Sequence, residues 1–374
     1  MAGSIVLFGA TGYTGRLTAE ALVRRGVRPV LAARNADRLT ALATELGGLE
    51  SEVADVSRPE SVRAIVSADD VLVSTVGPFL RWGAPAIEAA IDAGAIYIDS
   101  TGEPPFIREV FEHYDEPARA TGAGLLTALG YDYVPGNLAA SLAMERAGDT
   151  AVKVNVGYFI TGRASPRNAL SGGTMASLTG VVLSPAFAYR DGRLTTERSA
   201  KRVHTFTTAS GKKLTGVSVG SSEHFALPRM HPTLRDVDAY LGWFGPASRA
   251  MQAMTIAGEV AVVRRGVDKL GRRFVKGSTG GPDEAARSLT GSLVIAEAFN
   301  SSGTLLSRVE LKGVNGYTFT GEMLAWGAQR ALEHGVQGAG ALGPVEAFGL
   351  HELEAGCAEI GLASDPAATT AGAA

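Results

Sequence analysis

A glycine-rich turn near the start of the chain constrains the fold more than any other sequence feature. The apolar run Ile5–Phe8 leads directly into Gly9–Gly15, with the sequence Gly-Ala-Thr-Gly-Tyr-Thr-Gly, and apolar residues at helical spacing follow. A strand, a G-x-x-G-x-x-G turn and a helix in this order are typical of a dinucleotide-binding βαβ unit. Gly9 permits the tight turn, Gly12 lets a pyrophosphate approach the backbone, and Gly15 lets the helix pack close to the strand.

The helix that follows this turn offers free backbone N–H groups and the positive end of its dipole to phosphates. We therefore predict that the turn binds a dinucleotide through most of its residues. The predicted cofactor-binding residues are Gly9, Thr11, Gly12, Tyr13, Thr14 and Gly15. The alternative is a strand–helix turn that binds no ligand.

The end of the second expected strand distinguishes NADP from NAD. An NAD site needs Asp or Glu about 20 residues after the turn to bind the ribose 2′-hydroxyl. This chain instead has Ala32-Ala33-Arg34-Asn35. A guanidinium offers a planar fork to a 2′-phosphate and stacks on adenine. We therefore predict NADP as the cofactor, with Arg34 and Asn35 at its adenosine end. The alternative is that Arg34 is only a solvated charge where a helix begins.

Further turns are expected at the carboxyl ends of strands, where open parallel sheets bind their ligands. Asp55 and Val56 are predicted to lie at the adenine edge. Val76, Gly77 and Pro78 follow the most apolar strand and are predicted to lie beside the nicotinamide ribose. Each turn alone is ordinary, but their common position on one sheet edge favours a functional interpretation.

Strand and helix patterns alternate over the first 130 residues or so, which indicates a parallel sheet covered on both faces. The expected strands are Ser4–Phe8, Pro29–Ala33, Glu52–Ala54, Val71–Val76, Ala95–Asp99 and Gly124–Ala128. The helices between them are expected at Arg16–Arg25, Ala36–Leu46, Pro59–Val66, Ala84–Ala93 and Pro105–Thr121.

After Pro135 the pattern changes to period-two alternation, which is typical of antiparallel strands. Strands are expected at Val152–Ile160, His204–Ala209, Lys213–Val219, Ser288–Asn300 and Leu305–Gly313. Helical stretches are expected at Asn137–Ala147, Met175–Leu183, Val237–Phe274, Glu322–His334 and Pro344–Leu362. The predicted fold class is α/β: a Rossmann-type doubly wound parallel sheet with a second α+β domain that contains a mixed or antiparallel sheet.

This length of 374 residues favours more than one core. We predict an NADP-binding domain over residues 1–133 and a substrate and dimerisation domain over residues 134–342. A C-terminal helix over 343–363 is expected to pack back on the first domain, followed by a flexible tail, 364–374.

Composition and charge exclude several classes of function. Lys and Arg number 35 against 38 Asp and Glu, so no global basic field favours nucleic acid. Cys357 is the single cysteine, which excludes an internal disulfide framework and agrees with a cytoplasmic protein. The N-terminus lacks the charged region of a signal peptide, and no run of 18 apolar residues predicts an integral membrane segment.

The usual catalytic motifs are missing, which narrows the chemistry. None of the nine tyrosines is followed by Lys four residues later, as short-chain dehydrogenases require, and no G-x-S-x-G elbow is present. The six histidines are scattered, so we predict no catalytic metal. Hydride transfer needs only an oriented cofactor and a proton donor. We predict Tyr131 or Tyr133 as the donor, oriented by Asp132 or Glu103. Packing at the domain junction is the alternative role for these tyrosines, and Tyr158 and Tyr317 are weaker candidates.

The motifs together resemble one family. They are Gly9–Gly15, Ala33-Arg34-Asn35, Val76-Gly77-Pro78-Phe79, Tyr97-Ile98-Asp99 with Gly102-Glu103, Gly130-Tyr131-Asp132 with Val134-Pro135, Gly281-Pro282 with Glu284 and Arg287, and Gly316-Tyr317 with Thr320. This set is similar to the saccharopine dehydrogenase-like proteins, in particular their bacterial trans-acting enoyl reductase branch. The resemblance implies an NADP-dependent reductase with a Rossmann domain and an inserted α+β domain. Gly136 departs from the pattern, because the family usually has Asp or Ser after this proline.

Three functional hypotheses remain open on the sequence. The first is an NADPH-dependent oxidoreductase that reduces a polarised double bond, enoyl C=C or C=N, of a small-molecule or carrier-bound metabolite. The second is a saccharopine-type amino-acid dehydrogenase, for which Arg163, Arg167 and Arg287 are candidate anion clamps. The third is a non-catalytic NADP-binding sensor, against which the long β-rich insertion argues.

Two stretches in the second half are candidate contact surfaces. The basic run over residues 264–276 is a candidate contact with a membrane surface or an acidic carrier, although such a run is more often a solvated face. Tyr240–Phe244 is a candidate lid or homodimer contact, with an ordinary core segment as the plainer interpretation. The substrate is expected between the two domains, near Gly77, Glu103 and the tyrosines.

Overall fold

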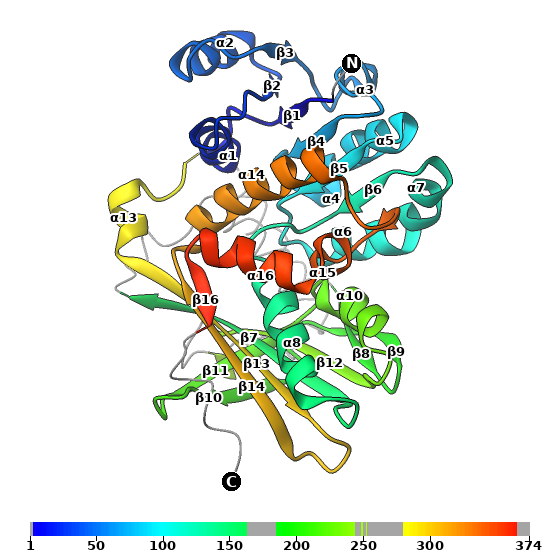
Figure 1. The fold of residues 1–374 in the computed structure, drawn as a ribbon, viewed down its shortest axis with the longest axis vertical. Helices are drawn as coiled ribbons and strands as arrows, with labels where there is room; N and C mark the ends of the chain where they lie inside the picture. Colours follow the sequence, from blue (N-terminus) through cyan, green and yellow to red (C-terminus); the bar gives the residue numbers. More distant parts are fainter. Residues whose placement is uncertain (1–2, 163–184, 244–247, 250–251, 253–279, 365–374) are drawn as a thin grey trace, which may run out of the picture. The chain divides into compact units, whose positions relative to one another are not determined.

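The computed structural model describes residues 3–162, 185–243, 248–249, 252 and 280–364 (Figure 1). The chain divides into two compact units. Unit 1 comprises residues 1–102, 106–134 and 316–352, and unit 2 comprises residues 103–105, 135–315 and 353–374. Each unit is built around its own sheet, and each is considered separately below.

Unit 1 is a seven-stranded sheet with the order β15-β6-β5-β4-β1-β2-β3. Its strands are β1 (Ile5–Phe8), β2 (Val30–Ala33), β3 (Ser51–Val53), β4 (Val71–Ser74), β5 (Ile96–Asp99), β6 (Gly124–Leu126) and β15 (Gly340–Ala341). All six pairings in the sheet are parallel. The strand order reverses beside β1, and ligands of such sheets bind at the carboxyl edge near that point.

Helices surround this sheet. They are α1 (Tyr13–Arg24), α2 (Ala36–Glu45), α3 (Pro59–Arg63), α4 (Phe79–Trp82), α5 (Ala84–Ala93), α6 (Pro104–Glu109), a π-helical turn (Val110–Tyr114), α7 (Asp115–Thr121), α14 (Gly316–His334) and α15 (Pro344–Phe348). The longer ones, such as α1 and α5, bury several apolar residues. Strands β1 and β4 are buried at every residue. Two covered faces explain why these strands read as continuous apolar runs.

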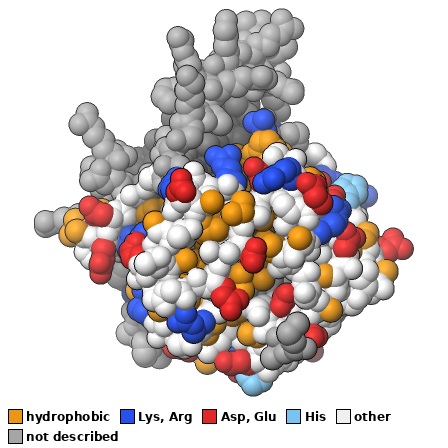
Figure 2. Space-filling view, turned by 90° about the horizontal axis from the view of Figure 1, so that it is seen from above, with side chains coloured by type: hydrophobic (Ala, Val, Ile, Leu, Met, Phe, Trp, Pro, Cys, Tyr) orange, Lys and Arg blue, Asp and Glu red, His pale blue; other side chains and the backbone are white. Residues whose placement is uncertain are grey.

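The surface of unit 1 beside β3 and α3 mixes charges of both signs (Figure 2). Arg63 is paired there with Glu88 and Asp92, and Arg16 with Glu20 and Glu45. Interspersed ion pairs of this kind give no extended basic surface on that face. None of the helices in the described ranges combines the length and apolarity needed to cross a bilayer.

Unit 2 is built on a nine-stranded sheet with the main order β10-β11-β12-β7-β13-β14-β16, and off this path β8 pairs with β12 and β9 pairs with β8. Its strands are β7 (Lys153–Gly162), β8 (Pro185–Arg190), β9 (Arg193–Arg198), β10 (Val203–Thr207), β11 (Lys213–Val219), β12 (Asp236–Leu241), β13 (Thr290–Phe299), β14 (Leu305–Gly313) and β16 (Leu362–Ser364). Strands β7 and β12 pair in parallel and the others antiparallel, so the sheet is mixed. The predicted fold class is confirmed.

Among the described residues, α8 (Val134–Ala147), α10 (Glu223–Met230), α13 (Glu284–Ser288) and α16 (Leu350–Glu359) belong wholly or mainly to unit 2, which also includes the first two residues of α6. One face of the sheet carries an apolar cluster of Phe159, Phe206, Tyr240, Leu293 and Ile295. Tyr158 of β7 points to the opposite face, because side chains alternate along a strand, and it meets the start of α8 there.

The structure moves two boundaries of the predicted domains. The chain returns to unit 1 at Gly316 and not at residue 343, because α14 packs on α1, β4 and β5. Residues 343–363 do not form one helix on the first domain. Gly349, with φ 81°, separates α15 from α16, and residues from Leu353 onward belong to unit 2, where β16 pairs with β14.

One expected helix is wrong. The stretch predicted as helical from Val237 begins with strand β12, whose aspartates Asp236 and Asp238 are paired with arginines of neighbouring segments. The hairpin β8–β9 was not expected at all. Met175–Leu183, most of residues 244–279 with the basic run, and the candidate clamps Arg163 and Arg167 lie outside the described residues.

Candidate functional site

The three glycines of the first turn serve different purposes. Gly9 has φ 90°, and a Cβ on it would lie 2.7 Å from Thr75 Oγ1. A Cβ on Gly15 would overlap the carbonyl oxygen of Gly9, so this glycine is needed for α1 to pack on β1. At Gly12 a Cβ would meet only the oxygen of Gly9, at 3.2 Å, among the described atoms, and the backbone conformation is ordinary. Packing therefore explains Gly9 and Gly15, whereas Gly12 leaves space in front of the turn.

The N-terminus of α1 has the properties of a phosphate site. No side chain caps it, and no acidic residue lies in its first turn. By contrast, Asn35 Oδ1 caps α2 by accepting a hydrogen bond of 2.9 Å from the N–H of Arg38. An uncapped helix start beside the open side of Gly12 fits a pyrophosphate, which supplies the missing negative charge and acceptors. Tyr13 and Thr14, two of the predicted binding residues, form the first turn of this helix, which begins three residues earlier than expected.

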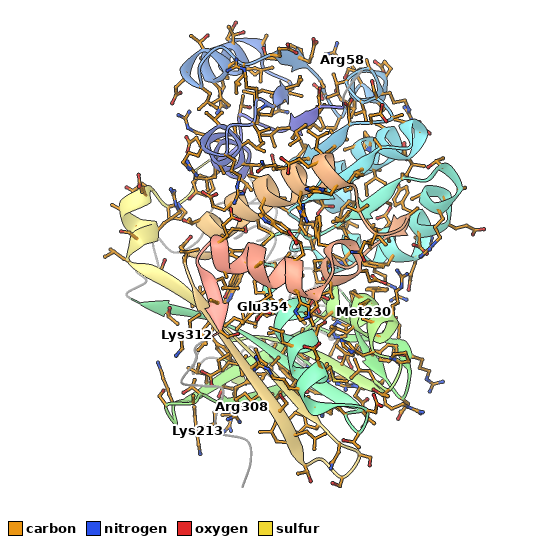
Figure 3. The ribbon with its side chains drawn as sticks, in the orientation of Figure 1. Arg58, Lys213, Met230, Arg308, Lys312 and Glu354 are labelled. Atoms are coloured by element: carbon orange, nitrogen blue, oxygen red, sulfur yellow. The ribbon has the colours of Figure 1, made fainter. Side chains whose placement is uncertain are left out.

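Basic residues surround the adenosine end of the predicted site. Arg34 is exposed after β2, and it is one of the charges that lower the pKa of Asp55. The main cause of that lowered pKa is a hydrogen bond from the N–H of Ser57, and Arg58, at the start of α3, adds its charge (Figure 3). Arg38 donates to the carbonyl oxygen of Thr11 at 3.2 Å.

Arg38 was not singled out on the sequence. It stands in the first turn of α2 and reaches back to the glycine turn, so it adds a second guanidinium near the expected 2′-phosphate. Asn35, a predicted cofactor residue, has a defined structural role as the cap of α2. Val56 is half-buried in the turn after β3.

The turn after β4 is hydrogen-bonded to the end of β1 and the first glycine of the glycine turn. Thr75 Oγ1 lies 3.2 Å from the carbonyl oxygens of both Phe8 and Gly9. Val76 is half-buried, and Gly77 and Pro78, joined by a cis peptide bond, are exposed. The predicted residues Val76–Pro78 are therefore presented at the carboxyl edge of β4, next to the turn that follows β1.

Asp99, at the end of β5, organises the turn that follows β6. Its buried carboxylate accepts hydrogen bonds from the N–H of Thr101 at 2.8 Å, the N–H of Ala128 at 2.9 Å and the hydroxyl of Thr127 at 2.9 Å. Burial raises the pKa of Asp99 to about 6, against the opposing effect of these donors. Ala128 has φ 61°, which is unfavourable for a residue with a Cβ, and the bond to Asp99 holds it there. The two turns thus form one rigid edge.

Asp132 lies on this edge as a buried carboxyl with few polar contacts. Its Oδ1 is buried and has no hydrogen-bond partner among the described residues. Its Oδ2 faces Gly102, where an added Cβ would lie 3.1 Å away. Burial raises the pKa of Asp132 to about 7. An isolated buried carboxyl with a pKa near neutrality is suited to holding and releasing a proton.

The two predicted proton-donating tyrosines flank this carboxyl but are more enclosed. Tyr131 is 6% exposed and Tyr133 is 2% exposed. The backbone N–H of Tyr131 donates to Thr320 Oγ1 of α14 at 3.0 Å, and its ring meets Phe319 edge-on. The fourth predicted catalytic residue, Glu103, belongs to unit 2, so unit 1 does not by itself bring it together with the other three.

Unit 2 contains a buried polar cluster that was not predicted from the sequence. Its members are Asn137, Ser141, Tyr158, Ser221, Ser222, Glu223 and His224, each at most 2% exposed. Tyr158 donates to Glu223 Oε1 at 2.5 Å, and the amide of Asn137 donates to Ser222 Oγ at 3.0 Å. A Cβ on Gly136 would overlap both Tyr158 Oη and Glu223 Oε1, so the departure from the family pattern at Gly136 makes room for this pair.

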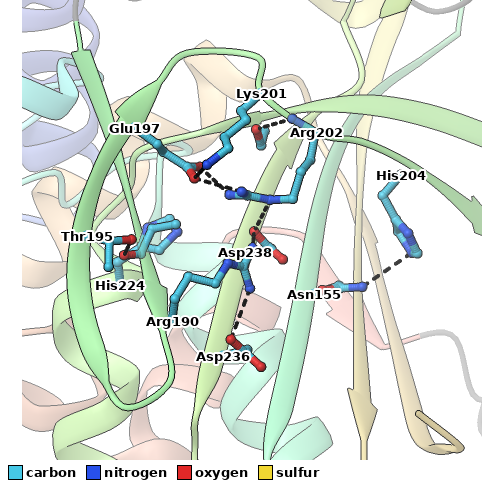
Figure 4. A network of polar contacts seen from close by, with 12 residues as sticks. Asn155, Arg190, Thr195, Glu197, Lys201, Arg202, His204, His224, Asp236 and Asp238 are labelled. Atoms are coloured by element: carbon cyan, nitrogen blue, oxygen red, sulfur yellow. Dashed lines mark hydrogen bonds and ion pairs between the residues drawn. The ribbon is translucent and has the colours of Figure 1, made fainter.

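An ion-pair network lies beside this cluster (Figure 4). Asp238, with a side chain only 1% exposed, accepts from both Arg190 and Arg202, and Arg202 also pairs with Glu197. Burial lowers the pKa of the nearby His224 to about 4, so its imidazole is neutral at physiological pH. The run Ser221-Ser222-Glu223-His224 matches no recognised functional motif. Only the tertiary structure therefore reveals this cluster.

Among the described residues, no group of three or more His, Cys, Asp or Glu side chains is placed to hold a metal ion.

Unit 1 is thus a dinucleotide-binding Rossmann domain, and its uncapped α1 and the arginines Arg34 and Arg38 favour a phosphorylated dinucleotide. Residues 5–126 match the family described as the saccharopine dehydrogenase NADP binding domain. This match confirms NADP as the cofactor, and it supports the resemblance that the sequence motifs indicated.

Curated relatives agree with this resemblance. A trans-acting enoyl reductase of Mycobacterium ulcerans is 34% identical over 210 residues, which cover 53% of this chain and 50% of the relative. A trans-acting enoyl reductase of Mycobacterium tuberculosis (strain H37Rv) is 39% identical over 140 residues, covering 36% of this chain and 34% of the relative. The chain thus aligns with no more than half the length of these relatives. The resemblance to the enoyl reductase branch is confirmed.

Among solved structures, apo saccharopine dehydrogenase (L-Glu forming) from Saccharomyces cerevisiae has the same fold. The TM-score is 0.57 at 12% identity, and the match covers 97% of this chain and 99% of the yeast chain. At this identity the likeness concerns the fold alone.

Proposed function

We propose that this chain is an NADPH-dependent oxidoreductase that reduces a polarised double bond of a small-molecule or carrier-bound metabolite. The observation that carries the proposal is Asp132, a buried carboxyl with an unpartnered oxygen at the carboxyl edge of an NADP-binding sheet. A cofactor-binding sensor has no need for such a proton-holding group, whereas a reductase does.

The residues that would hold the cofactor fit it. The backbone of Gly12 and the first turn of α1 receive the pyrophosphate, and Arg34 and Arg38 the 2′-phosphate. Val76, Gly77 and Pro78 border the nicotinamide side. When bound, NADPH supplies the hydride, and the protein orients it and excludes water.

Reduction of a double bond also requires a proton at the atom beside the hydride acceptor. Asp132, with its pKa raised to about 7, is half-protonated near neutral pH and carries that proton in our proposal. Asp99 acts as a positioning residue, because its hydrogen bonds fix the turn that precedes Asp132. Tyr131 and Tyr133 remain alternative donors, which the experiment below separates.

We favour a conjugated C=C over the amino-acid substrate of a saccharopine-type dehydrogenase. The mycobacterial relatives are named as enoyl reductases, and this name supports the same class of substrate here. Of the three candidate anion clamps, Arg287 is the one described, and it donates to the carbonyl oxygen of Pro282. A role for Glu103, or for a site shared by the two units, stays a prediction.

The test is NADPH oxidation with a conjugated enoyl thioester of pantetheine, measured for wild type and for Asp132→Asn, Tyr131→Phe and Tyr133→Phe. We expect Asp132→Asn to lower kcat about 100-fold with little change in NADPH affinity. Since the protonated carboxyl is the active form, wild-type kcat falls as the pH rises through about 7. Glu50→Gln, at an exposed carboxyl of unit 1, is the matched control.

Other outcomes would point elsewhere. A loss confined to a tyrosine variant would move the proton to that hydroxyl. NADPH binding without oxidation by enoyl or imine substrates would contradict the reductase and favour the sensor.

A further inference from the structure

The first turn of α14 contacts both ends of the dinucleotide edge of unit 1. Tyr317 meets Tyr13, the first residue of α1, edge-to-face, with ring centroids 5.4 Å apart. One turn further along, Thr320 Oγ1 accepts the N–H of Tyr131 at 3.0 Å. A Cβ on Gly130 would lie 2.9 Å from the methyl group of Thr320, so these segments are closely packed. The start of α14 therefore bridges the glycine turn and the turn after β6.

The strand order defines which half of the cofactor lies along this bridge. From β1 the sheet continues through β4 and β5 to β6 on one side, and through β2 to β3 on the other. The arginines of the adenosine end follow β2 and β3. The nicotinamide half must therefore extend from Gly12 toward the turns after β4, β5 and β6. Tyr13 and Tyr131 lie at the two ends of that path.

Packing of α14 on α1 does not need the Tyr13–Tyr317 contact. Farther along the helix, Gly321 lies against Leu17, and Glu322 pairs with Arg24 and Arg25. Tyr13 and Tyr317 remain half-buried, whereas Phe319, two residues after Tyr317, is fully buried in the core. Tyr317 thus presents part of an aromatic face at the edge where a nicotinamide riboside would lie, and aromatic faces stack on such rings.

We infer that Tyr317 is a cofactor-binding residue that contacts the nicotinamide riboside half of NADP, and that Thr320 positions Tyr131 beside it. This inference rests on NADP as the cofactor and not on the proposed reduction. It assigns a binding role to a segment that lies about 300 residues after the glycine turn in the sequence.

Comparing the affinities of two ligands distinguishes the nicotinamide half of the site from the adenosine half. NADPH occupies the whole site, whereas 2′,5′-ADP occupies only the adenosine end. We expect Tyr317→Ala to weaken NADPH binding about tenfold, equivalent to about 1.4 kcal/mol, and to leave 2′,5′-ADP binding unchanged. Tyr317→Phe keeps the ring and should bind NADPH like wild type. Arg34→Ala should weaken both ligands, because it removes the guanidinium at the 2′-phosphate. Affinities are measured by titration calorimetry, without any substrate.

The controls make each result decisive. Glu333→Ala changes an exposed residue at the far end of α14 and should bind both ligands normally. If Tyr317→Ala does not fold, Tyr317→Leu preserves an apolar side chain at the position and is measured instead. Unchanged NADPH affinity in the folded variant would overturn the inference, and so would an equal loss for both ligands. Absence of NADPH binding by wild type would instead contradict the cofactor.

Discussion

Asp99 and Asp132 show how two aspartates on neighbouring turns acquire different roles. Asp99 is surrounded by three donors, and its bonds hold the turn after β6 in place. Asp132 has a buried oxygen that no described residue contacts. Burial raises the pKa of both, to about 6 and about 7 respectively. The fully bonded carboxyl is a structural element, and the unbonded one is available for chemistry.

The glycine turn permits a test at the scale of single residues. Gly12→Ala adds a methyl group that meets only the oxygen of Gly9 at 3.2 Å, so we expect the stability to change little. The methyl group would occupy the open side of the turn, and NADPH affinity should fall at least tenfold. Gly15→Ala would overlap backbone atoms of Gly9 and Ala10, so it should destabilise unit 1 by about 2 kcal/mol or more.

The two variants are compared by urea unfolding without ligand and by NADPH titration. If Gly12→Ala binds NADPH normally, a pyrophosphate does not lie against this turn. If Gly15→Ala is as stable as wild type, α1 is able to shift away from β1, and the packing explanation of that glycine is wrong.

At the scale of elements, the packing of the start of α8 depends on a glycine, Gly136. Gly136 lies within the helix, where alanine normally stabilises by up to about 1 kcal/mol. Here, however, a Cβ would overlap the hydroxyl of Tyr158 on β7 and the carboxyl of Glu223 on α10. The overlap would push α8 away from β7 and α10, which the 2.5 Å hydrogen bond between Tyr158 and Glu223 joins.

We therefore expect Gly136→Ala to destabilise the protein by about 3 kcal/mol, since overpacking and a disrupted buried hydrogen bond outweigh the gain in helix propensity. Denaturant unfolding measures the change. Tyr158→Phe removes the overlapping hydroxyl, so the double variant should lose less stability than the sum of the single variants. Gly280→Ala, where a Cβ meets nothing within 4 Å, is the neutral control. A stabilised Gly136→Ala would show that the cluster rearranges without cost.

The spacing of apolar residues predicted the elements of unit 1 closely. Its central strands are buried on both faces and form continuous apolar runs, and its longer helices have apolar residues along one side. The Ala84–Ala93 helix of unit 1 has the expected bounds, and so do two strands of unit 2, Lys213–Val219 and Leu305–Gly313. Strand β12 was missed because aspartates disfavour strands unless distant arginines neutralise them, and β8 and β9 supply no stronger pattern. Similarly, the glycine turn and Arg34 are local signals, whereas Arg38, the contact of Tyr317 with Tyr13 and the cluster around Glu223 become visible only when distant segments meet.

At the scale of the whole molecule, burial shifts the pKa of two carboxyl groups upward in unit 1 and the pKa of one imidazole downward in unit 2. Unit 1 buries Asp99 and Asp132, whose pKa values are raised to about 6 and about 7. Unit 2 buries His224, whose pKa is lowered to about 4 mainly by burial, with Arg190 adding to this and Asp238 and Glu197 opposing it. Titration is therefore coupled to folding in opposite directions in the two units.

The signs follow from proton counts in the folded and unfolded states. Between about pH 4 and pH 6–7, the folded state of unit 1 holds protons on Asp99 and Asp132 that the unfolded chain has released, so acidification stabilises it. Between about pH 4 and 6.5, unfolded His224 is protonated and folded His224 is not, so acidification destabilises unit 2. Each fully shifted group contributes about 1.4 kcal/mol per pH unit.

Hydrogen exchange of the protein without cofactor tests this prediction, with peptides that cover β5 and β12. Between about pH 7.5 and about pH 5, after correction for intrinsic rates, we expect the free energy of opening to rise by about 4 kcal/mol at β5 and to fall by about 2 kcal/mol at β12. Asp132→Asn should reduce the rise at β5 and leave β12 unchanged, because it removes one of the two titrating carboxyls from unit 1. Changes of the same sign in both strands would contradict the prediction, since the two units would then share one cooperative response to pH.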